Sequence, residues 1–101
     1  GFHFTGSDAG HAQLKPLATW FGERIAAGEL KRGGSAADIG PLLSEGVPVG
    51  TPMVANERYF WFHHTTADTV DKVNPRELAR CTALMGAVAW WVADHPERLP
   101  R

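Results

Sequence analysis

The chain has 101 residues, enough for one domain at most. Ten Lys and Arg residues against 11 Asp and Glu residues leave a formal net charge of −1, so no long-range field favours nucleic acid or an anionic membrane as a partner. Because Cys81 is the only cysteine, an intramolecular disulfide is excluded, while the cellular compartment stays open.

The first predicted element is an amphipathic helix. Ser7 or Asp8 can cap its N-terminus, and Pro16 allows either a kink or a helix that begins near the proline. Gly28 is expected to end the helix. The apolar stripe at intervals of three and four consists of Leu14, Leu17, Ala18, Phe21 and Ile25.

Two strands are expected after this helix. Residues 29–32, "ELKR", predict a short edge strand, and residues 33–37, "GGSAA", predict a tight connection. Asp38 is then placed to cap a short helix that Gly46 closes. The apolar run "VPVGTPMV", residues 47–54, has the length of a buried strand.

A loop over residues 56–73 precedes a long final helix. Asn74, Pro75 and Glu77 occupy the N-cap, N1 and N3 positions of a helix start. Asp94 is expected to begin the end of this helix. The predicted apolar stripe consists of Leu78, Cys81, Thr82, Met85, Val88, Ala89 and Val92.

These elements indicate an α/β fold with helices on both faces of a sheet. A two-stranded sheet rarely stands alone, so we expect further strands upstream of Gly1. The N-terminus has no Met and no signal-peptide pattern, which favours the interpretation of the chain as a fragment. The apolar segment 78–93 is shorter than the roughly 20 residues that span a bilayer and contains Arg80, so we expect a core helix and no membrane partner.

The stretch "YFWFHHTTADT", residues 59–69, carries the clearest chemical signal. A neutral imidazole is a good zinc ligand, and ligands of α/β folds gather beyond the carboxyl ends of strands. However, the stretch lacks H-x-x-x-H spacing and the three protein ligands of a catalytic zinc. Chemistry alone therefore leaves His63 and His64 as half a metal site or as polar loop residues beside core aromatics. Asp68 and Thr69 are expected to close a turn through their side chains.

Residues 38–71 and the closing "VADHPERLPR" resemble the carboxyl-terminal end of the M28 family of zinc metallopeptidases, in its carboxypeptidase Q-like branch. "GFHFTGSDAG" resembles it more weakly, so the likeness covers nearly the whole chain. "YFWFHHTTADT" is its most specific motif. The resemblance implies the C-terminal part of a three-layer zinc-exopeptidase (phosphorylase/hydrolase-like) fold, with residues 1–101 inside a single catalytic domain and helices flanking a mixed sheet.

The resemblance also implies a reaction. In the family, two zinc ions share a bridging aspartate and a water that a glutamate activates to attack a peptide carbonyl. The ligand histidine directly before Thr corresponds to His64, with His63 lining the site. Asp38 would be a nearby hydrogen-bonding group, and Tyr59 and Asp68 would belong to the substrate pocket.

The other ligands and the catalytic glutamate are expected upstream, so the chain is expected to hold no catalytic residue and to be inactive alone. The expected substrate is a short peptide or dipeptide. The resemblance further implies a secreted or periplasmic parent that forms a homodimer. Two alternatives stay open: a non-catalytic binding or dimerisation module, and a single-zinc cyclotransferase similar to glutaminyl cyclases.

Overall fold

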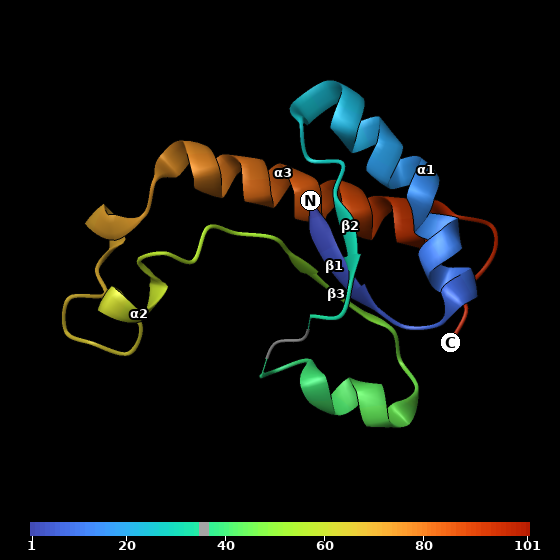
Figure 1. Cartoon of the computed structure of the whole chain (residues 1–101), viewed down its shortest axis with the longest axis horizontal. Helices are drawn as coiled ribbons and strands as arrows, with labels where there is room; N and C mark the ends of the chain where they lie inside the picture. The colour runs from blue at the N-terminus through green and yellow to red at the C-terminus, as the bar shows by residue number, and fades with distance from the viewer. Residues whose placement is uncertain (35–36) are drawn as a thin grey trace.

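The computed structural model describes residues 1–34 and 37–101 (Figure 1). Two residues of the predicted "GGSAA" connection therefore lie outside the described residues. The elements alternate between helix and strand, which confirms an α/β chain. In order they are β1 (Phe2–Thr5), α1 (Asp8–Ile25), β2 (Leu30–Arg32), the 3-10 helix η1 (Gly40–Glu45), β3 (Val49–Pro52), α2 (Tyr59–Phe62), the 3-10 helix η2 (Val70–Lys72) and α3 (Pro75–Asp94).

The sheet is mixed, and its strands lie in the order β2-β1-β3. β1 pairs in parallel with β2 and antiparallel with β3. The prediction of two strands was wrong, because the central strand, "FHFT", is too short for an alternating pattern to stand out from its surroundings. The edge position predicted for residues 29–32 is confirmed, and the predicted strand at 47–54 is reduced to Val49–Pro52.

α1 begins at Asp8, with Ser7 as its N-cap: the Ser7 Oγ accepts a hydrogen bond from the Gly10 N–H at 3.1 Å. Pro16 therefore lies inside the helix and not at its start. The helix ends at Ile25, and its C-cap is Ala26, with a φ of 53°, and not Gly28. Gly28 serves packing instead, because a Cβ there would lie 2.7 Å from the Cα of Gly22.

The core lies between the sheet and the two long helices. Alternate residues of a strand point to the same face, and Phe2 and Phe4 of β1 both point toward α1 and α3. The rings of Phe2 and Phe21 meet edge to face, with centroids 6.4 Å apart. Both long helices therefore cover one face of the sheet, and the prediction of helices on both faces was wrong for these two helices. The buried cluster consists of Phe2, Phe4, Leu14, Leu17, Phe21 and Leu84.

α3 starts as predicted, since the Asn74 Oδ1 accepts hydrogen bonds from the N–H groups of Arg76 and Glu77 at 3.0 and 3.4 Å. The predicted stripe is partly wrong. Leu84, outside that stripe, is 4% exposed, whereas Leu78 is 56% exposed. The sequence has no charged residue between Arg80 and Asp94, so periodicity could not identify the side of α3 that packs on the core.

In the described part of the chain, no helix is both long and apolar enough to cross a bilayer.

The 3-10 helix η1 does not start where the sequence predicted. It begins at Gly40, so its N-cap is Ile39, which makes no side-chain capping hydrogen bond. The prediction that Asp38 caps this helix was wrong, because Asp38 stands one residue too early. Gly46 closes the helix as predicted: it has a φ of 71°, and its N–H donates to the Leu43 carbonyl at 3.0 Å.

The segment 54–73 extends away from this core, at the left of Figure 1. The Cα radius of gyration is 14.8 Å and the principal extents are 44 × 34 × 20 Å. A compact domain of this length has a radius of about 13 Å, so the chain is more extended than a self-contained domain. The extended segment carries the histidine motif.

Candidate functional site

The histidine motif forms one helical turn followed by a series of tight turns. α2 covers the four aromatic residues, and His63 is its C-cap, with an N–H that donates to the Tyr59 carbonyl at 2.9 Å. Phe60 is 81% exposed and Trp61 is 67% exposed. The alternative in which these aromatic residues belong to the core is therefore wrong for Phe60 and Trp61, because α2 extends beyond the sheet and its covering helices (Figure 1).

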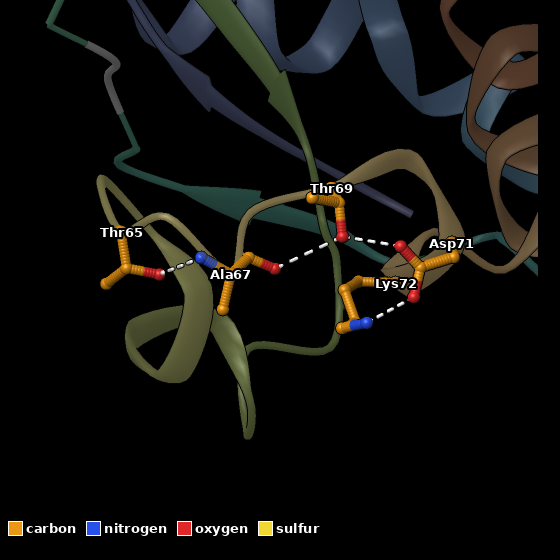
Figure 2. Close-up of polar contacts among 5 residues, drawn as sticks. All are labelled: Thr65, Ala67, Thr69, Asp71 and Lys72. Atoms are coloured by element: carbon orange, nitrogen blue, oxygen red, sulfur yellow. Dashed lines mark hydrogen bonds and ion pairs between the residues drawn. The ribbon is translucent and has the colours of Figure 1, made fainter.

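The Thr65 side chain closes the turn after the histidines. The Thr65 Oγ1 donates to the Phe62 carbonyl at 2.7 Å and accepts from the Ala67 N–H at 3.2 Å. The Thr69 hydroxyl lies 3.4 Å from the Ala67 carbonyl and also contacts Asp71 (Figure 2). The Thr69 hydroxyl thus contacts a carbonyl and a carboxylate, and among the described hydrogen bonds it accepts none from a backbone N–H, so the turn-closing role predicted for Thr69 was wrong.

Asp68 behaves differently from its prediction as a turn-closing side chain. Its backbone N–H donates to the Thr65 carbonyl at 3.1 Å, but its carboxylate takes part in none of the hydrogen bonds of residues 1–34 and 37–101. Thr65 closes the turn in its place, because its hydroxyl reaches the Ala67 N–H two residues on. The Asp68 carboxylate is left exposed to solvent or to a ligand.

The surroundings of Asp71 in the loop change the pKa of its carboxyl group. It forms an ion pair with the Lys72 ammonium and accepts a hydrogen bond from the Thr69 hydroxyl (Figure 2). The Lys72 contact, followed by the Thr69 contact, lowers the pKa of Asp71 below its ordinary value of 3.8. Asp71 therefore stays ionised and helps to hold η2 at the base of the loop.

The two histidine rings contact each other, with centroids 3.8 Å apart and planes at 58°. His63 also stacks on Tyr59, with centroids 4.4 Å apart, and its Nε2 lies 3.3 Å from the Tyr59 hydroxyl. The signal for this pair was the spacing of four residues, which places side chains on one side of a helical turn. Sequence reasoning missed it.

His64 has an exposed ring and a φ of 57°, in the left-handed region that non-glycine residues rarely adopt. This conformation costs roughly 1–2 kcal/mol. Within the described part of the chain, neither ring nitrogen of His64 takes part in a hydrogen bond. An exposed imidazole without a competing partner fits the chemistry of one zinc donor.

A cleft of about 530 Å³ lies between α2, the following loop and the start of α3. Tyr59, His63 and Asp68 all line it, so three of the predicted site residues come together. His64 is adjacent in the chain but not in the cleft wall, and Asp38 is in neither the wall nor a described contact with the loop. The charged residues of the wall are Glu57, Arg58, Asp68, Asp71, Lys72 and Glu77.

Over residues 1–34 and 37–101, no group of three or more His, Cys, Asp or Glu residues is placed to hold a metal ion. A catalytic zinc has about three protein ligands. The described residues therefore offer at most part of the donor set of such a site.

The chain is similar in sequence to known peptidases. It is similar over its full length to carboxypeptidases. The relatives are carboxypeptidase Q from Mus musculus, at 32% identity over 101 residues, from Bos taurus, at 30%, and from Homo sapiens, at 29%. No family model matches the sequence, and no solved structure matches it.

In each of these comparisons the alignment covers 100% of this chain and 21% of the relative. The chain thus spans about a fifth of the length of the curated relatives that it matches. The similarity supports a carboxypeptidase Q-like relative with a mixed α/β structure.

Proposed function

We propose that this chain is the C-terminal part of an M28-type zinc exopeptidase, in which His64 binds one ion of a two-zinc centre. The observation that carries the proposal is the exposed His64 ring, which the loop presents in an unfavourable backbone conformation. Backbone strain of this kind concentrates at functional sites. Similarity to carboxypeptidase Q over all 101 residues supports the same assignment.

The packing of the chain supports its placement in a larger three-layer domain. Phe60 and Val70 are 81% and 89% exposed, and Trp90 on α3 is 68% exposed. Exposed apolar side chains mark a contact surface where they form a contiguous patch, and in this proposal another part of the protein covers them. In this proposal the sheet continues upstream, and residues from that part cover the apolar surface and complete the donor set.

The chemistry of the proposed site divides between the metal and the protein. Zinc, when bound, would lower the pKa of a water molecule and polarise the scissile carbonyl. His64 would hold a metal ion through one ring nitrogen. Tyr59, His63 and Asp68 line the adjacent cleft, where they would bind and orient a short peptide. The general base would come from outside this chain, so the 101 residues alone would not hydrolyse peptides.

The test compares the full-length parent with its His64→Ala variant. We expect the parent to bind two zinc ions and to hydrolyse dipeptides. The variant should bind less zinc and lose at least about 100-fold in kcat/KM, because removal of a ligand disrupts the metal centre. Zinc is measured by elemental analysis after gel filtration. Unchanged zinc content and turnover in His64→Ala would end the assignment.

His11→Ala is the matched control. His11 lies on α1 beside Phe4, far from the loop in the chain, and its loss should leave zinc content and turnover unchanged.

The number of zinc ions bound by the parent also distinguishes the alternative functions. One zinc ion with cyclisation of N-terminal glutamine would favour a cyclotransferase, and no zinc would favour a binding or dimerisation module. In the proposed enzyme we also expect a homodimer and an exported parent.

A further inference from the structure

Tyr59, the first residue of the short helix α2, forms a side-chain pair with His63, the C-cap of the same helix. The Tyr59 and His63 rings stack at 24° with centroids 4.4 Å apart, and a hydrogen bond of 3.3 Å joins the Tyr59 hydroxyl to the His63 Nε2. A backbone hydrogen bond of 2.9 Å from the His63 N–H to the Tyr59 carbonyl closes the same turn. The His63 ring is thus held by a face contact and by its Nε2.

The His64 ring is in contact with the His63 ring. Its centroid is 3.8 Å from that of His63, and its φ of 57° turns it out of the path of the helix. On the other side, the Thr65 N–H donates to the Phe62 carbonyl at 2.9 Å. A left-handed non-glycine residue persists only where its surroundings determine it. Here the surroundings are two backbone hydrogen bonds and one imidazole ring.

We propose that Tyr59 is a positioning residue for His64, acting through the His63 ring. This inference rests on the proposed function, in which His64 is a zinc ligand. Tyr59 fixes the His63 ring, and that ring limits the directions in which the His64 imidazole can point. The neighbouring aromatic residue cannot replace Tyr59, because Phe60 meets His63 only edge-on at 6.4 Å.

Partners that orient a metal ligand typically contribute 10- to 100-fold to metal affinity. In the full-length parent we therefore expect Tyr59→Ala to weaken zinc binding by about 10-fold or more, measured by competition with a chelator. Tyr59→Phe keeps the stacked ring and loses only an exposed hydroxyl, so it should restore affinity to within about fivefold of wild type. Tyr59→Leu keeps apolar volume without a ring and should weaken binding like Tyr59→Ala.

A cobalt-substituted sample gives a readout that a general loss of stability would not produce. We expect the visible Co²⁺ absorption bands to shift or weaken in Tyr59→Leu and to return in Tyr59→Phe, because these bands depend on the geometry of the ligands. Trp61→Leu is the control, since Trp61 lies on the same turn, is 67% exposed, and makes no described ring contact with either histidine.

The outcomes separate this inference from the function on which it rests. If His64→Ala loses zinc while both Tyr59→Ala and Tyr59→Leu bind zinc as wild type does, the positioning role is wrong and the proposed function stands. If His64→Ala keeps its zinc, the proposed function is wrong and the positioning role falls with it. A Trp61→Leu loss equal to that of Tyr59→Leu would also overturn the positioning role.

Discussion

The aromatic residues of β1 and α1 and those of α2 have opposite environments. Phe2, Phe4 and Phe21 are 1–3% exposed and form the centre of the core, whereas Phe60 and Trp61 are 81% and 67% exposed. Both groups are rich in rings, so composition does not distinguish them. The difference lies in what surrounds them. The first group has a sheet and two helices around it, and the second extends from the core on a short helix (Figure 1).

The part of the chain that forms the core and the loop that carries the candidate site are therefore different regions. The sheet and the two long helices form a core through their own contacts, whereas the histidine loop is held by local hydrogen bonds and leaves Phe60 and Trp61 exposed. Loops with few buried apolar contacts are the less stable part of a structure. In the proposed enzyme, the loop would gain its final rigidity from the rest of the parent and from the metal.

The largest effect on stability should come from Phe21, which is 1% exposed. We expect Phe21→Ala to lower the free energy of unfolding of this chain by about 3–5 kcal/mol, because it opens a cavity in the core. Urea denaturation followed by circular dichroism measures the change. Phe60→Ala is the matched control and should stay within about 0.5 kcal/mol of wild type. Equal losses in the two variants would show that the two regions do not differ.

An intermediate effect is expected at the start of α3, where the core region meets the loop. Asn74→Ala removes the acceptor for the N–H groups of Arg76 and Glu77 and should cost about 1 kcal/mol. The same denaturation experiment measures it. Asn56→Ala, in the segment before α2, removes an amide that caps no described helix and should be close to neutral. A neutral Asn74→Ala would mean that the cap does not stabilise α3.

The smallest effect concerns Asp71 in the loop. Its pKa is lowered in the folded chain, so the contact with Lys72 and Thr69 stabilises the folded loop above the ordinary pKa of 3.8. That contribution is lost as the pH falls through the lowered pKa. We expect Lys72→Met, and to a smaller extent Thr69→Val, to raise the pKa of Asp71, as measured by NMR titration of its carboxyl carbon. A pKa that is the same in all three proteins would exclude these contacts in solution.

Local signals in the sequence predicted the parts of the fold that depend on neighbouring residues. Ser7, Asn74 and Gly46 act at helix ends as predicted, because capping depends on side chains and backbone within a few positions. Asp38 failed by one residue, since η1 begins later than its apolar pattern indicated. β1 was missed because a four-residue strand is stabilised by the partners on both its sides and not by its own sequence.

For the candidate site too, the sequence predicted some features and could not predict others. The motif directed attention to His64 through its resemblance, and Tyr59, His63 and Asp68 line one cleft as residues close in sequence would. The stack of Tyr59 on His63 and the left-handed backbone of His64 could not be predicted, because each depends on how the turn after α2 closes.

By itself, the sequence determined the α/β character, the start of α3, the position of one edge strand and the location of the histidine motif. Only the tertiary structure decided that β1 is central, that both long helices cover one face and that the α2 aromatic residues are exposed. The reason is physical. Caps and turns are set by contacts over a few residues, whereas strand order and burial depend on contacts between residues far apart in the chain.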